Sequence, residues 1–163
     1  MSDPPSTPIV LRPATIDDAL AITLTIHAAF EEFRGKLVPE SGAFAETPRT
    51  IAAELENGAG AIIAERNGSI VGCVMFRLYE GDLYFGRLSV LPEARGIGLA
   101  KRLIAAVERQ ARALGAPGVR LGVRVVLTDN QQLFESLGYR EISREAHEGF
   151  DYPTSINMRK ALN

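Results

Sequence analysis

The sequence predicts an α/β (α+β) fold, with a mixed and largely antiparallel central sheet of about seven strands flanked by helices. Three apolar runs rich in strand formers follow one another between residues 61 and 91, and helical periodicity occurs before and after them. Hairpin strands interspersed with crossover helices are typical of a mixed sheet covered by helices. The 163 residues suffice for one domain, which we expect to span 9–163 behind a flexible tail at 1–8.

The first part of the chain predicts one strand and two helices. A short apolar run at 9–12 ends at Pro13, and Thr15 suits the N-cap of a helix that continues to Phe30. We expect its buried stripe to comprise the residues at helical spacing, namely Ile16, Leu20, Leu24, His27 and Phe30. After an irregular stretch at 34–47, Pro48 at a first helical position predicts a second helix that stops near 57–58.

The middle of the chain predicts three consecutive strands, at 61–65, 69–78 and 83–91. Asn67-Gly68 between the first two is a strong signal for a tight hairpin, and a turn at 80–82 precedes the third. Cys73 lies in the second strand, and we expect a buried, reduced thiol there.

The last part predicts a long helix at 99–114 that ends before Gly115, then a strand at 119–126. The apolar stripe of the helix comprises Leu99, Leu103, Ile104, Val107, Ala111 and Leu114. A short helix from Asp129 or Asn130 to Leu137 follows, and strands at 139–145 and 154–160 enclose a loop at 147–153.

Composition and charge exclude several classes of protein. Apolar residues make up 46% of the chain and charged residues 23%, which is ordinary for a globular protein, and a net charge of −2 disfavours nucleic-acid binding. No run approaches the roughly 20 apolar residues of a membrane span, and two histidines and one cysteine offer no metal-ligand spacing. We therefore expect a cytoplasmic protein without nucleic-acid, membrane or metal partners. Exposed strand edges make a homodimer a reasonable expectation.

A glycine-bearing turn connects the strand at 83–91 to the long helix, and it contains Arg95, Gly96 and Gly98. The first amides of a helix have no partner within it, and together with the positive end of the helix dipole they favour an anion. Glycine lets a phosphate approach the backbone, and the planar guanidinium of arginine suits phosphate oxygens. The turn therefore predicts a cradle for a pyrophosphate.

Two familiar phosphate-binding motifs do not fit this turn. A P-loop needs Lys-Ser or Lys-Thr after its second glycine, where this chain has Leu99-Ala100. The dinucleotide fingerprint needs a third glycine where Lys101 stands, and an acidic residue about twenty positions on, where Arg120 and Gly122 stand.

The remaining pattern, Arg-x-x-Gly-x-Ala at Arg95, Gly98 and Ala100, closely resembles the acetyl-CoA motif of the GNAT acyltransferase superfamily. A second segment, Leu133 to Tyr139, resembles the superfamily's helix that reads Leu-Tyr-x-x-x-Gly-Phe. The predicted element order also matches the GNAT fold across nearly the whole chain. The resemblance implies a GNAT-like, acetyl-CoA-dependent N-acetyltransferase.

The resemblance also implies which residues bind acetyl-CoA. In the family, the strand before the cradle separates from its neighbour and pairs through its backbone with the pantetheine arm. Here that strand contributes Leu88, Ser89 and Val90, with the Val90 amide as oxyanion donor. The pyrophosphate would contact the amides of Arg95, Gly96, Ile97, Gly98, Leu99 and Ala100. Asn130 and Phe134 would lie beside the pantetheine, although Asn130 is equally suited to capping the short helix.

Phe134 departs from the family pattern, because many members carry a tyrosine there as general acid near the thioester sulfur. Phenylalanine has no proton to give. The thiolate would then take its proton from water, or from Tyr139 or Tyr84. Tyr139 matches a phenylalanine of the family motif and also suits the core.

Three residues are candidates for the general base or for contact with the acceptor. Asp82 begins the strand that enters the cradle, and it equally suits the turn there. His147 lies in the loop between the last two strands, and histidine titrates near neutrality. Glu32 follows the first helix, where family members form the acceptor wall.

Arg87 interrupts an apolar strand, and on the pleat of this strand it shares a face with Phe85 and Ser89. A charge in this position must be paired or reach solvent. Arg124 in the next strand raises the same question. Two arginines that line one cleft would suit an acceptor with a carboxylate, such as an amino acid.

The sequence as a whole predicts transfer of an acetyl group from acetyl-CoA to a primary amine of a small molecule or amino acid. Direct attack in a ternary complex would suffice, because holding thioester and amine in line supplies much of the rate. Peptide or protein N-terminal amines are alternative acceptors. A non-catalytic acyl-CoA-binding or sensing module is the alternative of another class, and Phe134 favours it.

Overall fold

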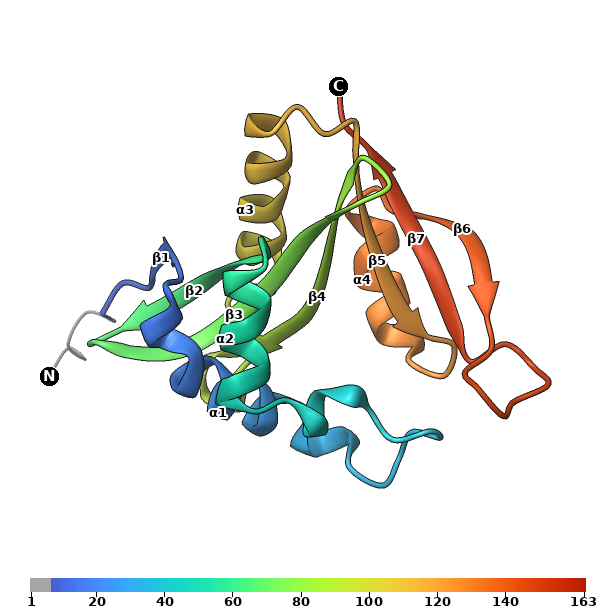
Figure 1. Cartoon of the computed structure of the whole chain (residues 1–163), viewed down its shortest axis with the longest axis horizontal. Helices are drawn as coiled ribbons and strands as arrows, with labels where there is room; N and C mark the ends of the chain where they lie inside the picture. Colours follow the sequence, from blue (N-terminus) through green and yellow to red (C-terminus); the bar gives the residue numbers. More distant parts are fainter. Residues whose placement is uncertain (1–6) are drawn as a thin grey trace, which may run out of the picture.

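The computed structural model describes residues 7–163, so residues 1–6 of the predicted tail lie outside the described part. A seven-stranded sheet runs through the molecule in the order β1-β2-β3-β4-β5-β7-β6 (Figure 1). The strands are β1 (Val10–Pro13), β2 (Gly60–Arg66), β3 (Ser69–Tyr79), β4 (Asp82–Val90), β5 (Gly118–Arg124), β6 (Arg140–Glu145) and β7 (Ser155–Ala161). Neighbouring strands are antiparallel except β4 and β5, which are parallel. The predicted mixed, largely antiparallel sheet is confirmed.

Four α-helices and several 3₁₀ turns connect these strands. The helices are α1 (Ala19–Phe30), α2 (Pro48–Glu56), α3 (Leu99–Ala113) and α4 (Thr128–Ser136). The 3₁₀ turns are η1 (Ile16–Asp18), η2 (Glu31–Phe33), η3 (Gly42–Ala45) and η4 (Pro92–Ala94). Every predicted helix is present, and β5 ends two residues earlier than predicted. Within residues 7–163, no helix is long and apolar enough to cross a membrane.

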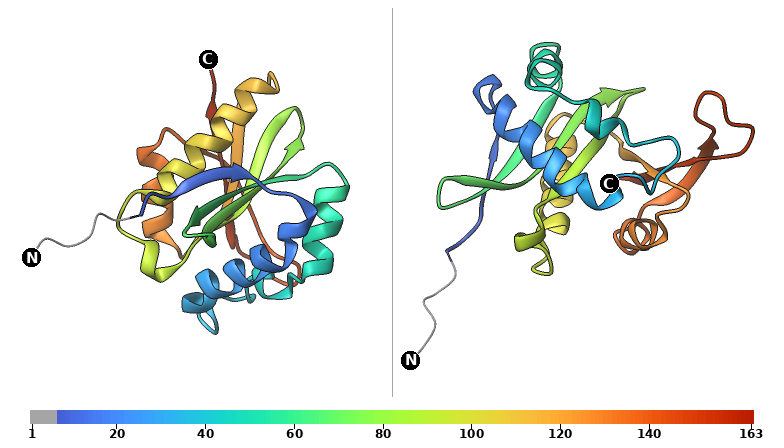
Figure 2. Two further views of the ribbon diagram at one scale, coloured as in Figure 1. Left: turned by 90° about the vertical axis from the view of Figure 1, so that its left-hand side faces the viewer. Right: turned by 90° about the horizontal axis from the view of Figure 1, so that it is seen from below.

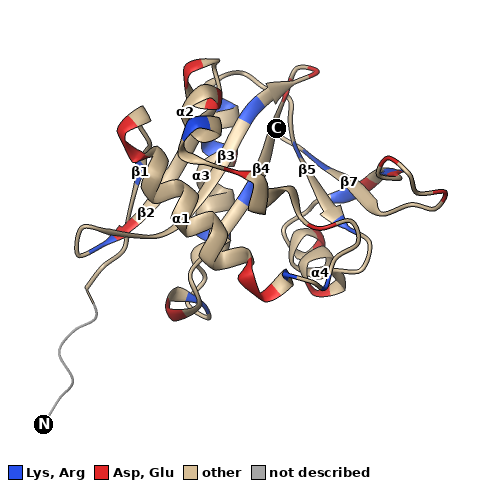
Figure 3. Cartoon of the chain, turned by 60° about the horizontal axis from the view of Figure 1, so that its bottom comes forward, with Lys and Arg blue, Asp and Glu red and all other residues tan. Residues whose placement is uncertain are grey.

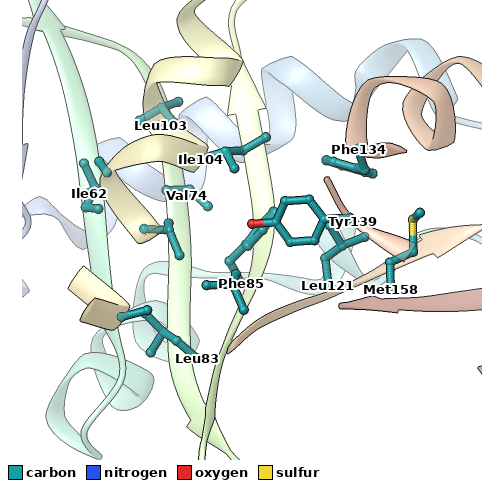
Figure 4. Close-up of a cluster of buried hydrophobic side chains, with 14 of the residues drawn as sticks. Ile62, Val74, Leu83, Phe85, Leu103, Ile104, Leu121, Phe134, Tyr139 and Met158 are labelled. Atoms are coloured by element: carbon teal, nitrogen blue, oxygen red, sulfur yellow. The ribbon is translucent and has the colours of Figure 1, made fainter. Parts of the chain in front are cut away.

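The helices form two layers, one on each face of the sheet (Figure 2). α1 and α2 cover one face, where Ile22, Ile26 and Ile51 pack against Cys73 and Met75 of β3. α3 and α4 cover the other face and enclose the larger core, part of which is drawn in Figure 4. The helices therefore leave two separate apolar cores with the sheet between them.

The hairpin between β2 and β3 forms as predicted. Asn67 and Gly68 have φ angles of 56° and 76°, and a two-residue turn of this type requires positive φ at both central positions. Asparagine and glycine tolerate that conformation better than other residues. The turn therefore sets the register of the β2–β3 pair.

The buried face of α1 differs from the predicted stripe. Leu20 and Leu24 are 59% and 60% exposed, whereas Ile22 and Ile26 are fully buried. Residues two positions apart lie on nearly opposite sides of a helix with 3.6 residues per turn. Because α1 is apolar on both sides, its spacing alone did not identify the face that meets the sheet. In α3 the predicted stripe is buried except for Leu114, which is half exposed beyond the helix end.

Candidate functional site

β4 and β5 form a V-shaped opening in the middle of the sheet. They pair over two residues only, Leu83 with Val119 and Tyr84 with Arg120. Beyond this point the two strands diverge, as Figure 1 shows. The separation expected from the family resemblance is therefore present, and it exposes one backbone edge of β4.

The backbone of Val90 faces this opening. The next amide, that of Leu91, donates a hydrogen bond of 2.9 Å to the carbonyl of Val71 in β3. Because backbone groups of successive strand residues point to opposite sides, those of Val90 point away from β3. Its carbonyl accepts a hydrogen bond of 3.2 Å from Nε of Arg95. The Val90 amide is thus not paired with β3 and points toward the opening.

A β-bulge redirects β4 just before Val90. Gly86 lies opposite Met75 and Ser89 opposite Cys73, so the strand carries one extra residue between these pairs. Arg87 occupies the bulge with a φ of 53°, a left-handed conformation that costs energy for a residue with a Cβ atom.

The bulge separates Arg87 from its predicted face. Phe85 is buried in the larger core, whereas the Arg87 side chain reaches Glu46 on the other side of the sheet, with Nη2 3.9 Å from Oε1. The prediction that Arg87 and Phe85 share a face is therefore wrong. The pattern of the strand alone contained no signal for the extra residue.

The turn between β4 and α3 has the backbone expected of an anion cradle. Gly96 and Gly98 both have a φ of 79°, and Gly98 is the N-cap of α3. A Cβ atom at either glycine would meet no atom within 4 Å, so space lies open in front of this turn. Glycine is required here by the backbone conformation, and the open space admits a ligand.

The guanidinium of Arg95 connects this turn to the end of α1. In addition to Val90, it donates a hydrogen bond of 3.1 Å to the carbonyl of Ala29 and forms an ion pair with Glu32. Arg95 and Glu32 therefore lie side by side at the opening. The three partners orient the Arg95 side chain along the turn.

A cleft of about 870 Å³ fills the space between the diverging strands, α4 and the segment after α1. Most residues singled out from the sequence line it, namely Glu32, Arg87, Leu88, Val90, Arg95, Gly96, Gly98, Leu99, Ala100, Asn130, Phe134 and His147. Ser89, Ile97, Asp82 and Tyr139 are not among the lining residues. The cleft thus brings the cradle, the exposed edge of β4 and the loop at 147–153 together.

Ser89 and Ile97 are turned away from the cleft. The Ser89 side chain is buried and donates a hydrogen bond of 2.9 Å to the carbonyl of Arg87, and the residue pairs with Cys73 of β3. Ile97 is 59% exposed to solvent. Only the backbone of Ile97 remains a candidate for ligand contact.

Asp82 lies in an ion-pair cluster where β4 begins. Its carboxylate is 2% exposed and accepts hydrogen bonds of 2.6 Å from Arg120 and 2.8 Å from Arg159. The hydrogen bonds from Arg159 and then from Arg120 hold the pKa of Asp82 below its usual value. An anion stabilised in this way is a poor proton acceptor.

The two tyrosines considered as proton donors have different surroundings. Tyr139 is fully buried, and its hydroxyl donates a hydrogen bond of 3.0 Å to Glu108; burial and this carboxylate raise its pKa well above the usual range. Figure 4 shows its ring beside Phe85 and Phe134 in the core. Tyr84 lines the cleft at the point where the strands part, and burial raises its pKa.

His147 is held by Thr154. Its backbone amide and its Nδ1 both contact Oγ1 of Thr154, which in turn donates a hydrogen bond of 3.4 Å to the carbonyl of Glu145. Nδ1 is thus occupied by Thr154, whereas Nε2 has no hydrogen-bond partner within residues 7–163. Burial, and then the charge of Arg124, lower the pKa of His147, so the ring is neutral near pH 7.

Asn130 lies in the first turn of α4 and lines the cleft. The N-cap of α4 is Leu127, so the alternative role of Asn130 as helix cap is wrong. Phe134, one turn later, also lines the cleft, with its ring edge-on to Phe85 at 6.1 Å between centroids. The cleft wall at this position is therefore apolar and carries no hydroxyl.

Sequence reasoning missed the part of the cleft formed by the irregular stretch after α1. Glu40 and Gly42 line the cleft, and Glu46 follows in the same segment. These residues belong to no motif, and only tertiary contacts bring them to the opening. In the described part of the chain, no group of three or more histidine, cysteine or acidic residues is arranged to hold a metal ion.

Comparison with known proteins agrees with this geometry. A family model described as Acetyltransferase (GNAT) family matches residues 25–139. A curated acetyltransferase from Pectobacterium atrosepticum is 37% identical over 86 residues, which make up 50% of this chain and 57% of that protein. The match thus spans little more than half the length of that relative.

Solved structures share the fold along almost the whole chain. The PaiA N-acetyltransferase from Thermoplasma acidophilum, crystallised in complex with coenzyme A, gives a TM-score of 0.74 at 15% identity and covers 95% of this chain and 99% of that chain. An acetyltransferase of the GNAT family from Staphylococcus aureus Mu50 gives a TM-score of 0.75 at 19% identity, with coverage of 96% and 100%. At these identities the likeness establishes the fold.

Proposed function

Because the chain belongs to the GNAT acetyltransferase family, we propose that it transfers an acetyl group from acetyl-CoA to a primary amine of a small molecule or amino acid. One observation carries this proposal: β4 leaves β5 after two residue pairs and leads directly into a turn with two glycines at a φ of 79°. An exposed strand edge next to a helix N-terminus suits a ligand with an amide-bearing arm and a diphosphate.

In this proposal the first amides of α3 bind the diphosphate, and the edge of β4 at Leu88 and Val90 pairs with the pantetheine arm. Asn130 and Phe134 form the opposite wall. The thioester carbonyl then lies at the Val90 amide, which stabilises the negative charge that develops on its oxygen. The fit is supported by the open space in front of Gly96 and Gly98, which a Cβ atom would partly fill.

His147 accepts the proton of the attacking amine in this scheme. Its Nδ1 is occupied by Thr154, and its lowered pKa keeps the ring neutral near pH 7. In the tautomer that carries the proton on Nδ1, Nε2 accepts the proton of the amine. The amine nitrogen forms a bond to the thioester carbon, its proton passes to Nε2, and the carbon–sulfur bond breaks. Tyr84, whose side chain lines the cleft, supplies a proton to the departing thiolate.

A direct attack is favoured over an acyl-enzyme. Cys73 is the single cysteine of the chain, it is fully buried, and burial raises the pKa of its thiol to about 12. A thiol without thiolate character and without access to the cleft cannot carry the acetyl group. We also propose a cytoplasmic location, where such a free thiol remains reduced.

Two measurements test the function. Coenzyme A and acetyl-CoA should raise the melting temperature, since a ligand that binds only the folded form stabilises it, whereas NAD should not. A panel of primary amines should then release free coenzyme A from acetyl-CoA. Absence of any stabilisation by coenzyme A would refute the proposed binding site.

A non-catalytic acyl-CoA sensor is the second candidate, and Phe134 is the observation that favours it. The phenylalanine removes the hydroxyl that many family members use at this position. Tight binding of acetyl-CoA without turnover on small-molecule or peptide amines would support the sensor. Turnover restricted to peptide N-termini would identify the other acceptor class.

A further inference from the structure

Two arginines from the diverging strands line the cleft, Arg87 of β4 and Arg124 of β5. Both reach the segment 40–46. Nη2 of Arg124 donates a hydrogen bond of 3.4 Å to the carbonyl of Glu40, and a Cβ atom on Gly42 would lie 3.0 Å from Nη2 of Arg87. The two guanidinium groups therefore flank the same short stretch of chain from opposite sides of the opening.

Neither guanidinium has its donors satisfied by a carboxylate. The closest approach of Arg87 to Glu46 is 3.9 Å, the longest ion pair among residues 7–163 and too long for a hydrogen bond. Arg124 forms no ion pair within the described chain. Two other arginines on this face, Arg120 and Arg159, bind Asp82 at 2.6 and 2.8 Å. The cleft arginines thus keep most of their N–H donors for another partner.

The carboxylates near the cleft form no direct hydrogen bond with these two arginines, although Glu40 and Glu46 contribute charge near them. Glu32 is paired with Arg95, and Oε2 of Glu40 accepts a hydrogen bond of 3.1 Å from the amide of Gly35. Glu46 is buried, one of its oxygens has no hydrogen-bond partner within the described residues, and burial raises its pKa, which weakens it as an anion.

The local charge also favours an anion from outside. Burial lowers the pKa of Arg124, and the charge of Arg124 contributes to the lowered pKa of His147. In Figure 3, ribbon segments coloured for Lys or Arg occur on β3, β4, β5 and β7. A desolvated cation without a counterion is costly, and a charge-assisted hydrogen bond to an anion offsets that cost.

We propose that Arg87 and Arg124 together bind the carboxylate of the acceptor, so that the acceptor is a free amino acid. The inference rests on the proposed acetyl transfer. Guanidinium groups bind carboxylates through paired, coplanar N–H donors. With the carboxylate held between the two strands, the amine on the adjacent carbon lies beside the thioester position and His147.

Matched acceptors test this subsite. Each of the common amino acids is compared with its own carboxamide, in which the amine is retained and the negative charge is removed. Release of coenzyme A gives kcat and KM for each pair. We expect the preferred amino acid to exceed its carboxamide by about tenfold or more in kcat/KM, mainly through KM, because a charged hydrogen-bond pair is lost.

Three variants assign the effect to residues. Arg87→Gln and Arg124→Gln should each raise KM for the amino acid about tenfold and abolish the preference over the carboxamide, with the affinity for coenzyme A unchanged. Arg124→Lys should restore part of the preference, because the charge returns without the planar fork. Arg109→Gln, at an exposed position of α3, is the matched control and should change nothing. Should Arg87→Gln fail to fold, the Arg124 variants still decide the question.

Binding and turnover separate this inference from the proposed function. If coenzyme A binds and carboxamides or amines without a carboxylate react as well as amino acids, the carboxylate subsite is wrong while acetyl transfer stands. Preference for a peptide N-terminus over every free amino acid also overturns it. If no amine reacts, calorimetry of amino-acid binding to the complex with coenzyme A still shows whether the carboxylate subsite exists. Amino-acid binding lost in both glutamine variants supports the subsite, and no binding by the unaltered protein refutes it.

Discussion

The carboxylate of Asp82 accepts two hydrogen bonds from Arg159, at 2.8 and 3.2 Å, and this contact links the start of β4 to β7 across β5. Arg120 of β5 binds the same carboxylate at 2.6 Å. The cluster thus fastens three strands at the closed end of the opening, directly beside the two residue pairs that join β4 to β5. Its role is to hold the strands together where they begin to diverge.

Asp82→Asn should therefore destabilise the protein by about 2 kcal/mol, because two partly buried arginines lose their anion. The arginines lower the pKa of Asp82 in the folded state. The stabilisation is thus fully present above the unfolded pKa of about 4 and is lost as the pH falls through the lower folded pKa. Chemical denaturation at pH 7 and pH 3 measures both effects. If Asp82 were instead the catalytic base, the variant would keep its stability and lose kcat.

Tyr84→Phe and Tyr139→Phe distinguish a proton donor from a core residue. Tyr84 lines the cleft, so its variant should lower kcat by about a hundredfold, the lower range for general acid catalysis, without a large change in stability. Tyr139 donates to Glu108 in the core, so its variant should cost about 1 kcal/mol of stability and leave kcat unchanged. Equal kcat in both variants would indicate that water protonates the thiolate.

Arg95→Ala should weaken the binding of coenzyme A about tenfold. The Arg95 side chain contacts the carbonyls of Val90 and Ala29 and the carboxylate of Glu32, and these contacts fix the turn that would bind the coenzyme. Glu32→Gln removes the ion pair and retains the two carbonyl contacts, so its effect should be less than threefold. Calorimetry with coenzyme A measures both affinities. Unchanged affinity in Arg95→Ala would remove this side chain from the coenzyme site.

Gly98→Ala has an internal control in Gly115→Ala. The φ angles are 79° and 73°, and a Cβ atom meets nothing within 4 Å at either site, so each variant should lose about 1 kcal/mol through backbone strain alone. Gly98 lines the cleft and Gly115 follows the other end of α3. Only Gly98→Ala should then weaken the binding of coenzyme A. The shift in melting temperature on addition of coenzyme A measures this effect. Equal coenzyme shifts in both variants would contradict the cradle.

His147→Gln should lower kcat about a hundredfold and change the pH dependence of the rate. Burial and the charge of Arg124 lower the pKa of His147, so the base is neutral at pH 7. The rate of the unaltered protein should therefore fall only at a pH below that at which a free histidine titrates. The variant should lack this acidic limb. If the rate of the variant still fell at acidic pH as in the unaltered protein, that pH dependence would arise from the acceptor amine or from another group, and not from His147.

The local elements could be predicted from the sequence, but several of their relationships could not. Asn67-Gly68 strongly favours a tight turn through its own backbone preferences, and Gly98 at the start of α3 follows from the same local chemistry. The bulge at Arg87 depends on how β4 pairs with β3, and two of the three partners of Arg95, Ala29 and Glu32, lie more than 60 residues away along the chain. The buried side of α1 was selected by the sheet, because Leu20 and Ile22 are equally apolar.

The two residue pairs between β4 and β5 are the whole backbone ladder that joins one half of the sheet to the other. A coenzyme lying in the opening would contact both halves of the sheet and so stabilise their association. Amide hydrogen exchange near the diverging ends would then slow throughout on binding, including at residues that the coenzyme does not touch. The free energy of unfolding of the bound protein would then include a contribution from contacts that the ligand makes with both halves of the sheet.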